Sequence, residues 1–263
     1  MNKLLAVACV MALSAAAAAE DYRAEVGVAY QNISGDYNAV VGTGEFYFNA
    51  VSTAERPWAE AAFLQREGGA FALAAVAEYD DFERAVVLEA GAEIYTLNDM
   101  LYLSGKVVRY AYDNDFYDDT FTDTAVEVEV GFSPVAGLLV STVYNSEQDY
   151  DFNVAGKYVR PLAGGSALNL EARYAVSEDL DTSFGSIDRD DTYGIGADYY
   201  FDPTFSLGVV VDNDFNGTTD VGLPEVSYGV RSTKFFAPAI AASAVLQVYD
   251  GEVGASVGAL FRF

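Results

Sequence analysis

The sequence predicts an all-β protein, an antiparallel up-and-down β-barrel that spans a membrane, and three observations support this prediction. Apolar and polar residues alternate over many segments of about 9 to 14 residues, a pattern typical of strands with one apolar and one polar face. The chain is 52% hydrophobic and yet carries a formal net charge of −26. After the N-terminal segment it has no apolar run of about 18 residues, the length that indicates a transmembrane helix.

The N-terminus predicts a signal peptide and, with it, the compartment. Lys3 precedes an apolar stretch at residues 4–13, and the small residues that follow end in three alanines. This arrangement is typical of a cleaved secretory signal. We expect cleavage near Ala19–Glu20, so that residues 1–19 are the signal peptide and residues 20–263 form the barrel domain. A membrane anchor is the alternative, but the apolar stretch is too short for it.

Composition excludes several classes of function. The chain has no His, the commonest general base and metal ligand. We therefore expect no enzyme, no catalytic residue, no metal site and no cofactor. The strong negative charge argues against binding to nucleic acid. The single Cys lies in the predicted signal peptide, so the mature chain has no disulfide.

The alternation predicts about fourteen strands, an even number as in outer-membrane barrels. The stretch TAVEVEVGF, for example, places Val126, Val128, Val130 and Phe132 on one face and Glu127 and Glu129 on the other. In chain order the predicted strands are 22–32, 38–51, 70–79, 84–96, 100–112, 122–132, 137–145, 149–160, 166–177, 190–201, 204–212, 223–235, 239–249 and 252–263.

The connections between these strands are of two alternating kinds. Some are short and rich in turn residues, and Phe201, Phe205, Phe235 and Phe236 flank them as an expected interfacial aromatic belt. The others are often longer and acidic, as at 113–121, 177–191 and 212–222. Outer-membrane barrels have short periplasmic turns and longer outer loops. We therefore assign the short connections to the periplasmic side.

Residues 57–67 do not fit the strand pattern and predict a short helix in the first periplasmic turn. Pro57 suits the first helical turn, and Gly68 and Gly69 suit the helix end. The alternative is that 57–66 is a strand and another predicted strand is wrong. Barrels of twelve or sixteen strands remain open for that reason.

The polar strand faces supply a candidate pore lining. If the apolar faces contact lipid, the charged residues between them point into the barrel. The inner face then holds ten acids and six bases, including Arg23, Glu25, Asp151, Glu225 and Arg262. Burying so many charges in a dry plug would be costly, so we expect a water-filled, moderately cation-selective channel. The pore-lining candidates are Glu45, Glu89, Glu93, Lys106, Glu127, Glu129, Lys157, Glu171, Arg173, Asp198 and Arg231.

Four stretches resemble the general bacterial porin family of Gram-negative outer membranes: PWAEAAFLQR (57–66), GADYYFDPTFSLG (196–208), KFF (234–236) and the terminal FRF. The resemblance implies an outer-membrane channel for passive diffusion of small hydrophilic solutes, with a homotrimer as one option. It also implies that Phe261 and Phe263 form a signal for the barrel-assembly machinery. Outer-membrane lipid and lipopolysaccharide are the remaining expected partners.

Two alternatives to a general porin stay open at this point. One is a substrate-specific channel and the other is a non-conducting structural or adhesive barrel. The acidic loops raise a further question, because DNDF occurs at 113–116 and again at 212–215. Carboxylates at this density can hold Ca²⁺ or Mg²⁺, but neither copy has EF-hand spacing. We favour solvated acidic loops, and whether loop 177–191 folds inward is left open.

Overall fold

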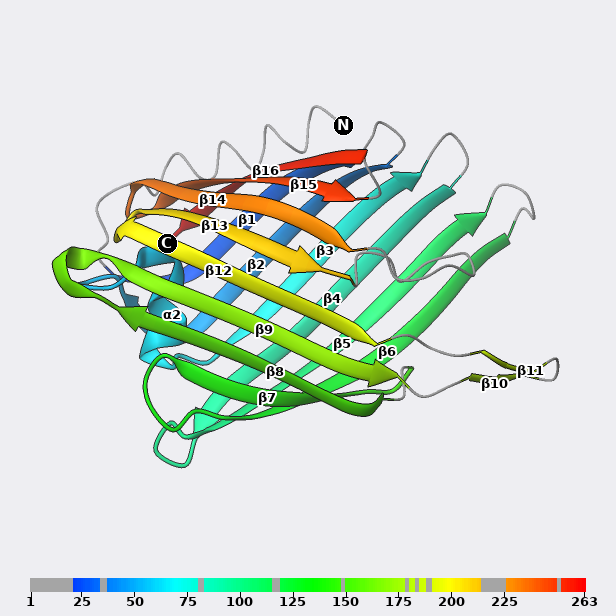
Figure 1. The fold of residues 1–263 in the computed structure, drawn as a ribbon, viewed down its shortest axis with the longest axis horizontal. Helices are drawn as coiled ribbons and strands as arrows, with labels where there is room; N and C mark the ends of the chain where they lie inside the picture. Colours follow the sequence, from blue (N-terminus) through cyan, green and yellow to red (C-terminus); the bar gives the residue numbers. More distant parts are fainter. Residues whose placement is uncertain are drawn as a thin grey trace.

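The structure is a computed structural model, and it describes residues 21–33, 37–79, 83–114, 119–147, 150–177, 180–182, 185–187, 191–213, 226–249 and 252–263. Fourteen strands form one closed antiparallel barrel in which consecutive barrel strands are neighbours (Figure 1). The predicted fold class is confirmed. The barrel strands are β1 Asp21–Ile33, β2 Tyr37–Ser52, β3 Gly69–Tyr79, β4 Glu83–Thr96, β5 Leu101–Asn114, β6 Asp119–Phe132, β7 Leu138–Asn145, β8 Tyr150–Pro161, β9 Ala167–Ser177, β12 Thr192–Asp202, β13 Phe205–Asp212, β14 Ser227–Ala237, β15 Ile240–Tyr249 and β16 Glu252–Arg262.

The end of the chain closes the barrel. β16 pairs with β1 in a register that places Arg262 opposite Glu25. The Phe263 amide donates to the Ala24 carbonyl at 2.9 Å, and the Phe263 carbonyl accepts from the Arg23 amide at 2.7 Å. Pairing of the first strand with the last closes the sheet, which is the condition for a β-structure in a membrane.

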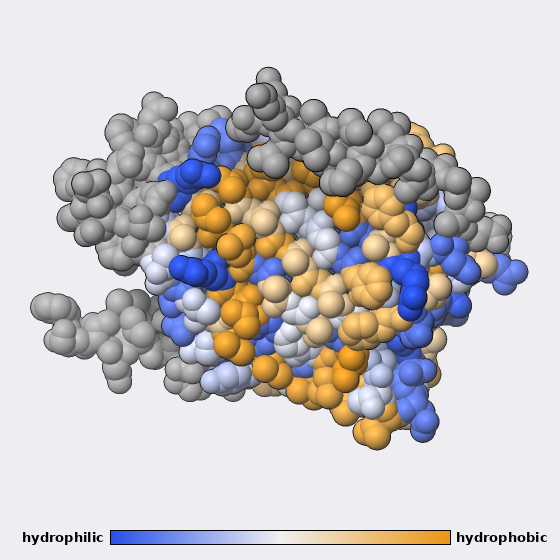
Figure 2. Space-filling model, turned by 180° about the vertical axis from the view of Figure 1, so that it is seen from behind, coloured by the Kyte–Doolittle hydropathy of each residue, from blue (hydrophilic) through white to orange (hydrophobic). Residues whose placement is uncertain are grey.

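The outer wall is apolar, as the alternation predicts. Val126, Val128, Val130 and Phe132 of β6 are 41–52% exposed. Water-soluble monomers rarely expose contiguous apolar patches of this extent. Figure 2 shows apolar residues over the middle of the wall and hydrophilic residues gathered toward its two ends. This is the surface that a lipid-embedded barrel presents. None of the helices in the described ranges is long and apolar enough to cross a membrane.

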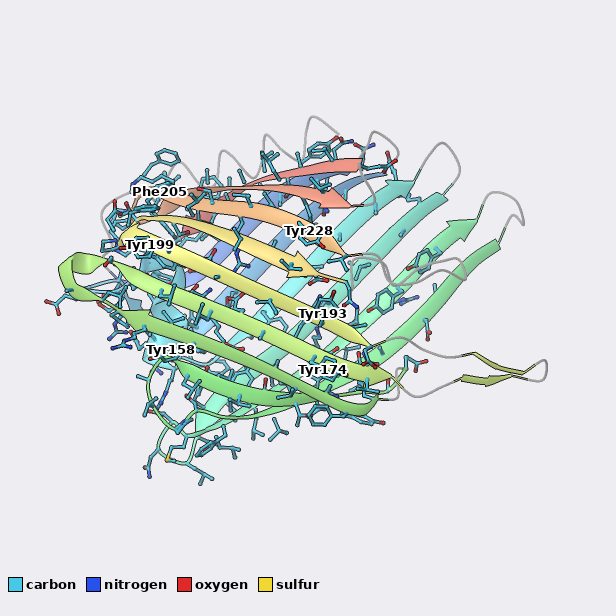
Figure 3. The ribbon with its side chains drawn as sticks, viewed as in Figure 1. Tyr158, Tyr174, Tyr193, Tyr199, Phe205 and Tyr228 are labelled. Carbon is cyan, nitrogen blue, oxygen red and sulfur yellow. The ribbon has the colours of Figure 1, made fainter. Side chains whose placement is uncertain are left out.

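Aromatic residues mark the two rims of this apolar wall. In Figure 3, Tyr158, Tyr199 and Phe205 lie toward one end of the barrel, and Tyr174, Tyr193 and Tyr228 lie toward the other. The prediction of a belt near the short turns holds for Phe201 and Phe236, which are 53% and 72% exposed. It is wrong for Phe235, which is buried, because inward and outward positions alternate along β14.

The helix predicted at 57–67 is present as η1 Trp58–Glu60 followed by α2 Ala61–Gln65. It ends differently from the prediction. Arg66 takes the left-handed conformation, with φ of 56°. Gly68 instead permits close approach to β4, because a Cβ there would lie 2.6 Å from the Glu93 carbonyl oxygen. A further short 3-10 turn, η3 Ala163–Gly165, connects β8 to β9.

Two other differences concern the long loops. Among the described residues, β14 starts at Ser227 rather than at 223. Within the predicted loop 177–191, a small hairpin forms from β10 Leu180–Thr182 and β11 Gly185–Ile187, and it projects beyond the barrel end in Figure 1. The predicted signal peptide, Glu225 and most of loop 212–222 lie outside the described residues.

Candidate functional site

All eleven predicted pore-lining residues occupy strand positions opposite the exposed apolar ones. Glu127 and Glu129, for example, alternate with the exposed Val126, Val128 and Val130 along β6. Because successive side chains of a strand point to opposite faces, the same alternation turns the other nine inward: Glu45 on β2, Glu89 and Glu93 on β4, Lys106 on β5, Lys157 on β8, Glu171 and Arg173 on β9, Asp198 on β12 and Arg231 on β14.

Three of these residues form one cluster across β4, β5 and β6. The Lys106 Nζ lies 3.3 Å from a Glu89 carboxylate oxygen and 3.0 Å from a Glu127 carboxylate oxygen. The register explains this, because Lys106 is directly opposite Glu127 on the neighbouring strand. The three side chains are 20–26% exposed. Lys106 thus offsets part of the acidic charge of this wall.

On the opposite side of the barrel, ion pairs cross over an intervening strand. Arg173 of β9 and Asp212 of β13 are 2.7 Å apart, and both lie opposite Gly194 of β12. A Cβ on Gly194 would lie 2.8 Å from the Arg173 Nε. The missing side chain of the glycine therefore lets the pair lie flat against the wall.

The same arrangement recurs one strand further along. Arg231 of β14 and Asp198 of β12 are 2.6 Å apart, and both lie opposite Gly208 of β13. Arg231 also contacts Glu171 at 3.0 Å. Asn169 donates to both Glu171 and Asp198 at 2.9 Å. A cavity of about 430 Å³ on this wall is lined by Lys157, Glu171, Arg173 and Arg231, among others. We call these four residues the basic wall because three of them are bases, and each of these bases is paired with a neighbouring carboxylate.

Three of the predicted pore-lining carboxylates have no ion-pair partner within the part of the chain that the structure describes: Glu45, Glu93 and Glu129. Glu93 accepts a hydrogen bond from the Tyr102 hydroxyl at 2.6 Å. Glu93 and Glu129 lie at the same level, because each is opposite Ser104 of the strand between them. We call the three together the acidic wall. It lies on β2, β4 and β6, away from the basic wall on β8, β9 and β14.

Sequence reasoning counted a surplus of acids but did not find this pairing. Five of the six predicted inner bases (Lys106, Lys157, Arg173, Arg231 and Arg262) are in ion pairs. The prediction is wrong for the sixth, Arg23. It lies on the outer face, where its guanidinium stacks over the exposed Phe46 ring and donates to the Phe48 carbonyl oxygen, because the strand register shifts between Tyr22 and Ala24. Ion pairs therefore neutralise much of the charge that a count of inner-face residues indicates. The carboxylates of the acidic wall are not neutralised in this way.

The connection between β2 and β3, residues 53–68, is not a simple turn. It enters the end of the barrel where the short turns lie, as the position of α2 in Figure 1 shows. Its helical part packs on one side through Ala61, which is buried with Tyr22, Tyr47 and Val51. We refer to residues 53–68 as the inserted segment.

The inserted segment also reaches the far side of the barrel. Glu60 contacts Lys157 of β8 at 2.8 Å and accepts from the Tyr200 hydroxyl of β12 at 2.9 Å. The backbone of Trp58 bonds to Pro203 and to the Arg262 guanidinium. The segment therefore lies across the short-turn end. The sequence shows the helix but not its insertion, because the contacts join residues up to 204 positions apart.

The fold and the inner face define a class of protein, the transmembrane β-barrel. No family model matches the chain, and no curated protein sequence matches it. Among solved structures, the outer membrane protein Omp33 of Acinetobacter baumannii is similar, with a TM-score of 0.69 and 21% identity over 92% of this chain and 99% of that one. A monoaromatic hydrocarbon channel, CymD, is also similar, with a TM-score of 0.54 and 12% identity over 92% and 89% of the two chains.

Proposed function

We propose that the protein is an outer-membrane porin, a water-filled channel for passive diffusion of small hydrophilic solutes. The observation that carries the proposal is the inner wall of a closed barrel lined with charged and partly exposed side chains. The Lys106, Lys157, Arg173 and Arg231 side chains are 26–52% exposed. Charges at this exposure are solvated, whereas a dry interior would have to bury them at high cost.

We further propose that the channel moderately prefers cations. The acidic wall leaves three carboxylates without a cationic partner among the described residues, whereas the bases of the inner face are already paired or bonded. Low-dielectric walls focus the field of such charges and raise the local concentration of cations. The Debye length of about 8 Å at physiological ionic strength limits this effect at the centre of a wide pore. The preference should therefore weaken as salt rises.

The test is the reversal potential of the refolded full barrel in a planar bilayer under a KCl gradient. The wild-type barrel should favour K⁺, and Glu93→Gln with Glu129→Gln should move the potential toward zero without closing the channel. These two changes break none of the ion pairs described above. Glu147→Gln, at an exposed position beyond β7, is the control for a remote loss of charge. A wild-type channel that favours chloride would contradict the proposed selectivity.

One observation favours a second candidate, a barrel that does not conduct in its resting form. The inserted segment lies across the short-turn end and contacts β8, β12 and β16. A folded barrel without stepwise conductance would support this structural role. A substrate-specific channel is the third reading, and competition of one solute class with ion flow would distinguish it from a general porin.

A further inference from the structure

Among the described residues, the seam between β7 and β8 has the fewest backbone pairs of any two neighbouring barrel strands. Backbone pairing covers four residue pairs, from Leu138 opposite Tyr158 to Ser141 opposite Ala155. The neighbouring β8–β9 seam, by contrast, is paired along its length from Pro161 to Tyr150. Thr142 to Asn145 of β7 and the facing part of β8 belong to described strands but form no ladder with each other. The two strands therefore separate in the half of the wall away from the short turns.

A side chain takes the place of the missing ladder. The Asn153 carboxamide accepts from the Val143 amide at 2.6 Å and donates to the Val143 carbonyl at 2.7 Å. It also accepts from the Thr142 hydroxyl at 3.0 Å. One Asn side chain thus satisfies the backbone of β7 that β8 would otherwise satisfy. A rupture of this contact would leave two polar backbone groups unpaired, which is costly in lipid.

The separated part of the seam lies within the apolar band. Register places Tyr144 and Thr142 level with Val128 and Val130 of β6, and these two valines are exposed to the outside. A cavity of about 740 Å³ is centred on the seam, with Val130, Tyr144, Phe152 and Val154 in its lining. Its position and lining make it accessible to lipid chains.

The inner surface of the same seam borders the other cavity. Ser141 lines both the 740 Å³ cavity and the 430 Å³ cavity of the basic wall. Leu139 and Ala155 from the two strands also line the inner one. A stretch of wall with few backbone pairs between β7 and β8 therefore separates a lumen cavity from a cavity at the lipid surface.

We propose that the β7–β8 seam is a lateral opening, by which small apolar or amphipathic molecules that have entered the lumen pass sideways into the hydrocarbon of the membrane. The Asn153 side chain holds the two strands together in the closed state. The four backbone pairs stay intact when the strands separate, and the solute enters the apolar outer cavity. The proposal shares the lumen with the proposed porin but uses a different exit, so a barrel can fail one test and pass the other.

The test uses intact cells whose only major outer-membrane channel is this protein. N-phenyl-1-naphthylamine, which fluoresces in hydrocarbon, is the probe, since lipopolysaccharide slows its direct entry. Thr142→Cys with Val154→Cys, bridged by a short bis-methanethiosulfonate that forms a disulfide with each thiol, should reduce dye entry to the rate of cells without the barrel. A reductant should restore it. Asn153→Ala should have the opposite effect and speed dye entry, because it removes the hydrogen bonds that join β8 to the Val143 backbone.

The control pair is Tyr158→Cys with Leu170→Cys, which lie opposite each other on the fully paired β8–β9 seam. Bridging this pair should leave dye entry unchanged. Ion conductance of the bridged Thr142–Val154 variant in a planar bilayer should match that of its reduced form, which separates the lateral route from the axial one. Equal dye entry in the bridged and reduced variants, with no effect of Asn153→Ala, would overturn the lateral opening.

Discussion

At the residue scale, glycine makes the inner-wall ion pairs possible. Arg231 and Asp198 meet across Gly208, whose position lets the carboxylate lie against the backbone. Both charges are predictable from alternation alone. Their pairing is not, because it depends on a register between strands that are not neighbours, and one residue of slip would turn either side chain outward.

Gly208→Ala should therefore destabilise the barrel. The added Cβ would overlap the Asp198 carboxylate and lie 2.6 Å from the Ala197 carbonyl oxygen, a backbone atom that cannot easily move. We expect a loss of about 1–3 kcal/mol, as for other overpacked sites, measured by urea unfolding in detergent or lipid. Gly44→Ala is the control, since its Cβ would have nothing within 4 Å. Equal midpoints for the two variants would contradict the expectation.

At the element scale, the inserted segment is the main departure from what the sequence predicts. Its helical character follows from Pro57 and the residues after it, and the prediction of a short helix is confirmed. Its placement inside the barrel depends on partners far along the chain, Lys157 and Tyr200. No local pattern encodes those contacts.

Glu60→Ala should loosen the inserted segment and raise single-channel conductance. Glu60 is 6% exposed, and its loss removes both the Lys157 ion pair and the Tyr200 hydrogen bond. Breaking a buried pair costs several kcal/mol, although Lys157, at 31% exposed, reduces that cost. Glu55→Asn is the control, because Glu55 is exposed and its φ of 57° suits Asn. Unchanged conductance in Glu60→Ala would show that the segment does not limit flow.

The terminal strand carries the second prediction at this scale. Deletion of Phe263 removes three backbone hydrogen bonds to β1 and, at the same time, the terminal residue of the proposed assembly signal. Phe263→Leu separates the two effects, because it keeps the backbone bonds and removes only the ring. We expect both variants to yield less heat-modifiable barrel in the membrane fraction. Normal insertion of Phe263→Leu would assign the defect of the deletion to barrel closure alone.

At the scale of the whole molecule, the sequence predicts the strand number, the closed antiparallel topology and the apolar outer wall. Strict alternation and alternating loop lengths carry that information. The arrangement of unpaired carboxylates on one side of the barrel and ion-paired bases on the other is not visible in the sequence, because it arises only when β2, β4 and β6 lie across from β8, β9 and β14.

Orientation in the membrane is the prediction that belongs to this scale. We expect the short-turn end to face the periplasm. Cys substituted for the exposed Ala59 of the inserted segment should not react on intact cells with a polyethylene-glycol maleimide too large to pass through the channel, whereas Cys substituted for the exposed Glu147 should react. Permeabilised cells provide the control, since both sites should then react. Labelling of Ala59→Cys in intact cells would reverse the orientation.

The inserted segment also has a mechanical consequence. It joins β2 to β8, β12 and β16 through Glu60 and Trp58. These contacts should make one end of the barrel resist deformation by lateral membrane pressure. Among the described residues, no segment makes comparable contacts across the half of the β7–β8 seam that lies away from the short turns. Bilayer tension should therefore deform the barrel unevenly. The largest deformation should occur at the seam where the fewest backbone hydrogen bonds join the two strands.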